Sequence, residues 1–256
     1  MRAACCEATV LSHESILPDI RLLRALWPDR EHAPHAGQFF TLRAWGADEA
    51  PFLSRPISVH KWEPETQTIE FLYQVIGEGT HKIAQLKTGD TFQLTGPMGN
   101  GFDTADLLSR YKKIAVVGGG IGTAPMFQLT RELAAAGVKP DVFFGFRDAP
   151  YCMEEYREIA NLVKVSTDTG AVGFHGFVTQ LYDPADYDVV LVCGPTVMMR
   201  NAARLCAEKG TPCFVSMEKK MACGIGACLG CTCETRSGEG KSVCKNGPVF
   251  DAAEVF

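Results

Sequence analysis

The sequence contains no apolar run that approaches the length of a membrane-spanning helix. Its first residues, Met1–Cys6, lack the apolar core of a signal peptide. An excess of positive charge is also missing, and the net charge of −5 argues against a nucleic-acid partner. We therefore expect a cytoplasmic protein that binds neither a membrane nor a nucleic acid.

Cysteine, in contrast, is abundant. The chain has 11 cysteines, an odd number, in 256 residues. In a reducing compartment thiols are more useful as metal ligands than as disulfides. The hydrophobic fraction of 46% is ordinary for a globular protein, and the length is sufficient for two compact domains and a small module.

Four of the cysteines have a spacing that predicts an iron–sulfur site. Cys223 and Cys228 are separated by four residues, Cys231 follows after two more, and Cys244 after a further twelve. This is the plant-type ligand pattern of a 2Fe–2S cluster. Glycines between the cysteines relieve the steric limits on the tight turns that aim three sulfurs at one small core.

Other uses of these cysteines have to be weighed. A structural zinc site usually has two Cys-x2-Cys pairs, and here Cys228 and Cys231 form one such pair. Disulfides are disfavoured in a chain with no secretion signal. Unligated thiols would leave the glycines between them without a purpose. Cys233 lies in the same stretch, and we interpret it as a spare because the ligand pattern is complete without it.

The first segment, 1–108, has the pattern of an antiparallel sheet. Residues 38–43, 68–75 and 90–94 are predicted strands, because they alternate in polarity and are rich in β-branched or aromatic residues. Glycine and proline punctuate the stretches between them. Short strands at this spacing predict a small antiparallel barrel.

Two short motifs in this segment carry chemistry. The first comprises Arg55, Pro56, Ile57 and Ser58; arginine is a planar donor for a pyrophosphate, and a serine hydroxyl can bond to a flavin ring. The second is the turn 77–80, whose backbone N–H groups could hold a phosphate. Taken alone, an Arg-Pro pair can also be a plain strand start.

The middle segment, 109–215, alternates strands with helices. Residues 113–117 are an apolar run typical of a buried parallel strand, and 125–136 are a predicted helix that ends at Gly137. Further strands are predicted at 142–146, 163–166 and 189–192. This order predicts a doubly wound parallel sheet.

Between the first strand and helix of this segment lies a glycine loop. It does not have the Gly-x-Gly-x-x-Gly pattern, because Pro125 stands at the last position. Proline is comfortable in a first helical turn, and a glycine loop before a helix favours a dinucleotide over a merely structural turn. The candidate residues are Gly118, Gly120, Gly122, Thr123 and Pro125.

A second candidate follows the predicted strand 189–192. Cys193, Gly194 and Pro195 stand at the carboxyl end of that strand, where parallel sheets bind ligands. For the adenosine end of the nucleotide, Asp148 would suit a ribose and Arg147 a 2′-phosphate. We favour NADH over NADPH.

The order of these motifs resembles the ferredoxin-reductase superfamily, although Ile57 stands where many members have tyrosine. The resemblance implies a flavin-binding barrel followed by a nicotinamide-nucleotide domain, and it places Cys193 near the nicotinamide. It assigns no role to His60 or His81, which we expect to be solvated loop residues. It adds these residues to the flavin site: Leu72, Tyr73, Gln74, Gly79 and Thr80.

More closely, residues 217–231 and 246–250 are similar to the electron-transfer subunits of type B dihydroorotate dehydrogenases, which also accounts for Ile57. That resemblance implies FAD, one 2Fe–2S cluster and NAD(H). It implies an FMN-containing catalytic subunit as partner, in a heterotetramer with two subunits of each kind. The flavin barrel would occupy 1–108, the NAD domain 109–215 and the cluster module 216–256.

Two rival functions remain open from the sequence. A related reductase subunit could serve another partner, such as a hydrogenase or a glutamate-synthase-like enzyme. A non-catalytic redox sensor would use the cluster as a switch. Since a flavin is the adapter between two-electron and one-electron carriers, an electron relay explains all three segments.

Overall fold

The computed structural model describes residues 3–256, and its first half is a seven-stranded antiparallel sheet. The strand order is β4-β3-β7-β1-β2-β6-β5. The elements are β1 Ala4–Leu17, β2 Ile20–Leu26, β3 Phe39–Arg43, β4 Arg55–Ser58, β5 Lys61–Glu63, β6 Thr68–Gln74, α1 Glu78–Ile83 and β7 Thr91–Met98. The predicted strands at 38–43, 68–75 and 90–94 are confirmed.

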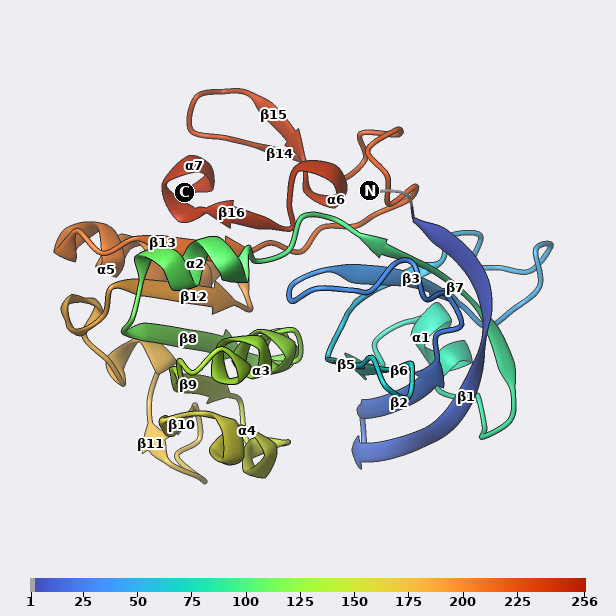
Figure 1. The fold of residues 1–256 in the computed structure, drawn as a ribbon, viewed down its shortest axis with the longest axis horizontal. Helices are drawn as coiled ribbons and strands as arrows, with labels where there is room; N and C mark the ends of the chain where they lie inside the picture. The colour runs from blue at the N-terminus through green and yellow to red at the C-terminus, as the bar shows by residue number, and fades with distance from the viewer. Residues whose placement is uncertain (1–2) are drawn as a thin grey trace.

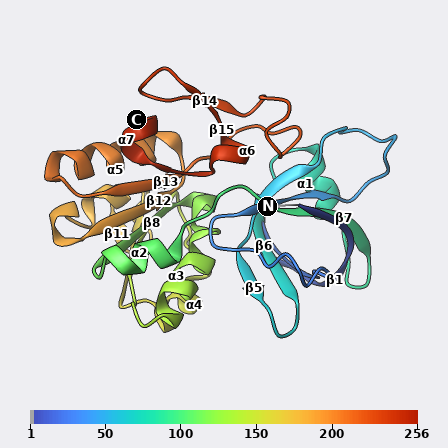
Figure 2. The ribbon, with the colours of Figure 1, turned by 45° about the horizontal axis from the view of Figure 1, so that its top comes forward.

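This sheet curls around its own core into a half-barrel (Figures 1 and 2). Trp27, Phe40 and Phe71 pack edge to face inside it, with ring centroids 5.0 and 5.8 Å apart. The barrel expected from the sequence is therefore open. Its two edge strands, β4 and β5, are joined by the short link Val59-His60 and form no ladder with each other among residues 3–256.

The second half is also seven-stranded, in the order β11-β10-β9-β8-β12-β13-β16. All neighbours run parallel except β13 and β16. Its elements are α2 Thr104–Arg110, β8 Ile114–Gly119, α3 Met126–Ala135, β9 Asp141–Phe146, α4 Met153–Ile159, β10 Leu162–Thr167, β11 Phe174–His175, β12 Val189–Cys193, α5 Thr196–Lys209 and β13 Cys213–Ser216.

Alternate residues of the central strands enter two different cores, as a strand covered on both faces requires. Ile114 and Val116 of β8 pack on one side together with Leu129 of α3. Ala115 and Val117 pack on the other side, against residues of α5. The predicted doubly wound sheet is confirmed, and the helices on its two faces are seen in Figure 1.

The cysteine-rich C-terminal part has little regular structure of its own. It contains β14 Thr232–Glu234, β15 Gly240–Ser242, α6 Val243–Asn246, β16 Val249–Asp251 and α7 Ala252–Val255. Its strand β16 extends the second sheet by pairing with β13, with Ser216 opposite Val249. The segment 217–248 thus leaves and rejoins one sheet at neighbouring strands.

Helix α3 docks the two sheets onto each other through one of its faces. Gln128 Oε1 accepts the N–H of Trp62 at 2.9 Å, and Arg131 donates to the carbonyl of Trp62 and to the Glu63 carboxylate. One turn further, Glu132 accepts the N–H of Ala36 at 2.9 Å. Since these side chains lie three and four positions apart, they share a face of the helix.

His60 belongs to the same junction, and the expectation that it is a solvated loop residue is wrong. Only 4% of its surface is exposed. It follows the edge strand β4, and the docking of α3 against that edge covers it. No helix among residues 3–256 is long and apolar enough to cross a membrane.

Candidate functional site

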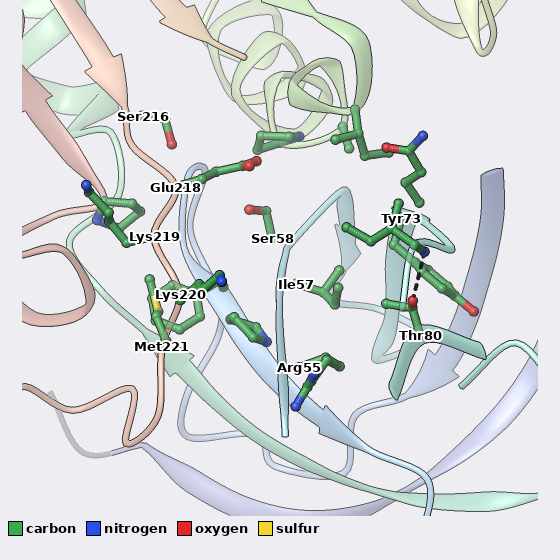
Figure 3. Close-up of a pocket in the computed structure, with 18 of the residues that line it drawn as sticks. Arg55, Ile57, Ser58, Tyr73, Thr80, Ser216, Glu218, Lys219, Lys220 and Met221 are labelled. Atoms are coloured by element: carbon green, nitrogen blue, oxygen red, sulfur yellow. Dashed lines mark hydrogen bonds between the residues drawn. The ribbon is translucent and has the colours of Figure 1, made fainter. Parts of the chain in front are cut away.

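A cavity of about 610 Å³ opens where the half-barrel meets the second sheet. Strands β4 and β6 and the start of α1 form one wall. The glycine loop before α3 forms the second, and the segment Ser216–Met221 after β13 forms the third (Figure 3). Nine of the residues predicted for cofactor binding line it: Arg55, Pro56, Ile57, Ser58, Leu72, Tyr73, Gln74, Thr80 and Pro125.

The Arg55 side chain has the features of a group that binds an anion. Its Nε is buried and has no hydrogen-bond partner in the described part of the chain, while its Nη2 donates to the carbonyl of Leu53. A buried N–H without a partner is costly, and a bound anionic group would satisfy it. Gly79 lies directly against this side chain, because a Cβ there would come within 2.9 Å of Arg55 Cδ. The donor and its setting fit a cofactor diphosphate.

The turn at 77–80 is built differently from the simple phosphate cradle that the sequence predicts. The Thr80 hydroxyl accepts the N–H groups of Ile76 and Gly77, each at 3.0 Å, and donates to the carbonyl of Gly77 at 2.8 Å. The N–H of Gly77 is therefore used inside the protein. Thr80 orders the entry to α1 beneath the cavity.

The two faces of strand β6 contact different parts of the molecule. Leu72 packs toward the junction, whereas the ring of Tyr73 lies in the half-barrel core. The Tyr73 hydroxyl bonds to His13 Nε2 at 3.0 Å, and Gln74 Nε2 donates to Asp19 at 2.7 Å. These two polar side-chain ends are thus bonded to residues that do not line the cavity.

The segment Ser216–Met221 was not among the predicted site residues. Figure 3 shows Glu218 and Lys220 reaching from it into the space before β4. Desolvation by the surrounding groups raises the pKa of the Glu218 carboxyl above its usual range. Together with Arg55, Lys219 and Lys220 give the cavity three cationic groups and one carboxyl. In the sequence, this segment is indicated only by its place in the chain, because it joins a buried strand to the cysteine loop.

The glycine loop lies in close backbone contact with the turn after β12. A Cβ on Gly122 would lie 2.5 Å from the Cα of Gly194. Gly120 has a φ of +54°, which favours glycine. Of this loop, Ile121, Ala124 and Pro125 face the cavity. The other predicted residues do not line it: Gly118, Gly120, Gly122 and Thr123.

The turn after β12 packs directly against the backbone of the glycine loop. Gly194 has a φ of +153°, and its Cβ position is 2.9 Å from the N atom of Gly119. Pro195 caps α5. The Cys193 side chain is buried, and burial raises the pKa of its thiol well above the usual range. Cys193 therefore remains a neutral thiol, and this turn offers a ligand mainly backbone.

The side chains considered for nucleotide selectivity extend into solvent beyond β9. Arg147 and Asp148 are 89% and 60% exposed and lie 3.6 Å apart as an ion pair. An exposed pair of this kind is weakly held. Our preference for NADH stays a prediction.

All four cysteines of the predicted cluster site accept a backbone N–H at sulfur. Cys228 donates to Cys223 Sγ at 3.4 Å, and Gly230 donates to Cys228 Sγ at 3.4 Å. Cys244 donates to Cys231 Sγ at 3.4 Å, and Gly226 donates to Cys244 Sγ at 3.1 Å. Partial burial alone would raise the pKa of Cys223, but N–H donors from residues such as Cys228 lower it to about 6. Such donors favour thiolates.

The sulfurs are arranged as two pairs, Cys223 with Cys228 and Cys231 with Cys244. Within residues 3–256, no three His, Cys, Asp or Glu side chains gather closely enough to hold a single metal ion. A two-iron cluster needs two thiolates at each iron, whereas one zinc needs all four around one point. The pairing fits a 2Fe–2S cluster.

Cys233 behaves differently from these four. Its thiol donates to the carbonyl of Lys241 at 3.4 Å across the β14–β15 hairpin. It is 6% exposed and packs in the core. This agrees with its interpretation as a spare, which stays a prediction.

Known proteins resemble the chain over nearly all of its length. The family described as the iron–sulfur cluster binding domain of dihydroorotate dehydrogenase B matches residues 218–256. The dihydroorotate dehydrogenase B (NAD(+)) electron transfer subunit of Clostridium acetobutylicum is 44% identical over 86% of this chain and 85% of that protein. The subunit of the same name from Caldanaerobacter subterraneus is 38% identical over 98% of both chains.

Solved structures share the fold of this chain. The structure of the NADH-dependent reduced ferredoxin-NADP oxidoreductase, studied for flavin-based electron bifurcation, has a TM-score of 0.85 and 28% identity. It covers 97% of this chain and 89% of that chain. A ferredoxin NADP+ reductase from Neisseria gonorrhoeae, with a TM-score of 0.68, 17% identity and coverage of 85% and 95%, shares the fold. The chain belongs to the family of dihydroorotate dehydrogenase B electron transfer subunits.

Proposed function

We propose that this chain carries electrons between NAD(H), FAD and a 2Fe–2S cluster, and exchanges them with an FMN-containing catalytic subunit that converts dihydroorotate to orotate in pyrimidine biosynthesis. One observation carries the proposal: the wall Ser216–Met221 of the cavity continues without a break into the cysteine loop. A cofactor in the cavity and a cluster on the loop would then be neighbours along one short segment. We place this activity in the cytoplasm, where thiols stay reduced.

In this proposal each wall of the cavity has its own task. Arg55, with Gly79 beside it, would hold the FAD diphosphate through charge-assisted hydrogen bonds. Ile57 and Leu72 would cover the ring system, and the hydroxyl of Ser58 would bond to its polar edge. When bound, a flavin takes two electrons from a nicotinamide and releases them one at a time.

The glycine loop is the proposed site for the nicotinamide nucleotide. Its backbone approaches the turn Cys193–Pro195 closely at the carboxyl ends of β8 and β12, which is where parallel sheets bind ligands. Because Ala124 and Pro125 also line the cavity, a nucleotide at this loop would lie beside the flavin. We keep the division into a flavin unit at 1–108, an NAD unit at 109–215 and a cluster module at 216–256.

Co-expression with a candidate FMN-containing catalytic subunit tests the proposed partner. We expect the two chains to co-purify as a heterotetramer with two of each, and to oxidise dihydroorotate with NAD⁺ as acceptor. The control is the catalytic subunit alone, which we expect to be inactive with NAD⁺. Co-purification with a hydrogenase or glutamate-synthase-like enzyme instead would contradict the proposal, and so would a chain whose bound flavin is not reduced by NADH.

Replacing Arg55 by alanine should release the flavin and leave the cluster in place. Loss of charge-assisted hydrogen bonds to a diphosphate costs about 1.5–3 kcal/mol, which is roughly a tenfold to hundredfold loss of affinity. FAD and iron per chain are measured after gel filtration. Arg110→Ala on the exposed face of α2 removes the same charge far from the cavity and serves as control. Equal FAD content in the two variants would contradict the role of Arg55.

A further inference from the structure

Three aromatic rings form a ladder across the junction of the two sheets. The ring of His60, in the link between β4 and β5, stacks on Phe127 of α3 with centroids 4.9 Å apart and planes at 22°. Phe127 in turn packs edge to face on Tyr156 of α4 at 5.0 Å. The ladder therefore joins the half-barrel to two helices of the second sheet.

Both ends of the ladder bond to the glycine loop. His60 Nδ1 lies 2.8 Å from the carbonyl oxygen of Ala124, and the Tyr156 hydroxyl donates to the carbonyl oxygen of Thr123 at 2.6 Å. A carbonyl only accepts, so His60 must carry its proton on Nδ1. Burial lowers the pKa of His60 to about 4, and the ring is neutral at physiological pH.

These two bonds fix consecutive carbonyls, one toward the half-barrel and one toward α4. The loop that they hold is shared between the two proposed sites, because Ala124 and Pro125 line the cavity while Gly122 packs on Gly194. The docking of α3 does not depend on them, since Gln128, Arg131 and Glu132 make their own bonds to the half-barrel. His60 adds a hydrogen bond to the backbone of the glycine loop itself.

We propose that His60, together with Tyr156, is a positioning residue that sets the nicotinamide-binding loop against the flavin wall of the half-barrel. The inference rests on the proposed function. According to it, the junction sets the distance and angle between the flavin and nicotinamide rings, and does not set the affinity for either cofactor. Neither residue touches the proposed ligands, so both act through the Thr123 and Ala124 backbone.

The test compares His60→Phe with His60→Asn in the full chain loaded with FAD. Phenylalanine keeps a ring against Phe127 but has no donor. Asparagine carries an N–H at the same number of bonds from Cα as histidine Nδ1. We expect His60→Phe to slow flavin reduction at saturating NADH about tenfold, because small misplacements of reacting groups are costly. The dissociation constant for NAD⁺ should change less than threefold, and His60→Asn should recover most of the rate.

Amide hydrogen exchange provides a readout that needs no turnover. Peptides covering residues 118–127 should exchange faster in His60→Phe and in Tyr156→Phe, which deletes one oxygen and leaves the ring, than in the wild type or His60→Asn. Unchanged exchange in both variants, or a slowed His60→Phe that asparagine does not rescue, would overturn the inference. If wild-type flavin is not reduced by NADH at all, the proposed function fails, while the exchange result still decides whether the loop is tied.

Discussion

Replacing Cys228 by alanine is expected to remove most of the iron, to less than about one tenth of the wild-type content. Cys228 forms one of the two sulfur pairs together with Cys223, and an iron with a single protein thiolate on that side is poorly held. Because metal binding energy is also folding energy in small modules, the loop around it should loosen too. Iron and acid-labile sulfide per chain, measured on anaerobically purified protein, check this result.

Cys233→Ser is the matched control, since it changes a cysteine two residues beyond the proposed ligand Cys231. Its thiol bonds to the Lys241 carbonyl, and a serine hydroxyl can make that bond, so the iron content should stay near wild type. Iron loss in Cys233→Ser comparable to that in Cys228→Ala would show that the ligand set is wrongly assigned. Zinc in place of iron in the wild-type protein would remove the basis of the proposed relay.

A valine at Gly122 should abolish tight binding of the nicotinamide nucleotide while the flavin stays bound. The new Cβ would lie 2.5 Å from Gly194 Cα, 2.6 Å from its N atom and 2.7 Å from the Cys193 carbonyl carbon. Since all three are backbone atoms, the two turns must separate. Overpacking of this kind costs about 1–3 kcal/mol of stability, and we expect the affinity for NAD⁺ to fall at least roughly tenfold.

The dissociation constant for NAD⁺ and the FAD content per chain measure this effect. Gly137→Asn is a suitable control, because Gly137 directly follows the C-cap residue of α3. It has a φ of +86° and has nothing within 4 Å of its Cβ position. Asparagine tolerates this conformation, so this variant should bind both cofactors. If Gly122→Val binds NAD⁺ as tightly as Gly137→Asn, the nucleotide does not use this loop.

The features that could be predicted from the sequence are those that depend on residues close together in the chain. The strand 189–192 and the glycine loop between the first strand and helix of the second half depend on spacings of a few residues, and both lie where the sequence predicts them. The cysteine spacing is equally local, and the ligand role of these cysteines stays a prediction. Strand β7 begins with an alternation of exposed and buried residues that can be read from the sequence before the fold is known. Arg55 and Ser58 both line the cavity, at the two ends of the edge strand β4.

What could not be predicted depends on contacts between distant residues. The sequence predicts a solvated His60, because no residue near it in the chain indicates that α3 docks over it. The wall Ser216–Met221 faces β4 only because β13 ends beside the half-barrel. The hairpin β1–β2 is not predicted for another reason: the alternation of β1 is interrupted at Ser12–Ser15, where both faces carry polar residues.

The anchoring of the cysteine loop has a consequence for how the chain delivers its electrons. Both ends of the excursion 217–248 are held on adjacent strands, with Ser216 and Val249 in register, and Gly224 rests against Met98 of the half-barrel. The sheet has already closed this long loop, so the entropy of closure does not fall on the metal. In the proposed relay, this anchoring would hold the cluster module in one place on the second sheet. The catalytic subunit would then have to dock against the module where it lies.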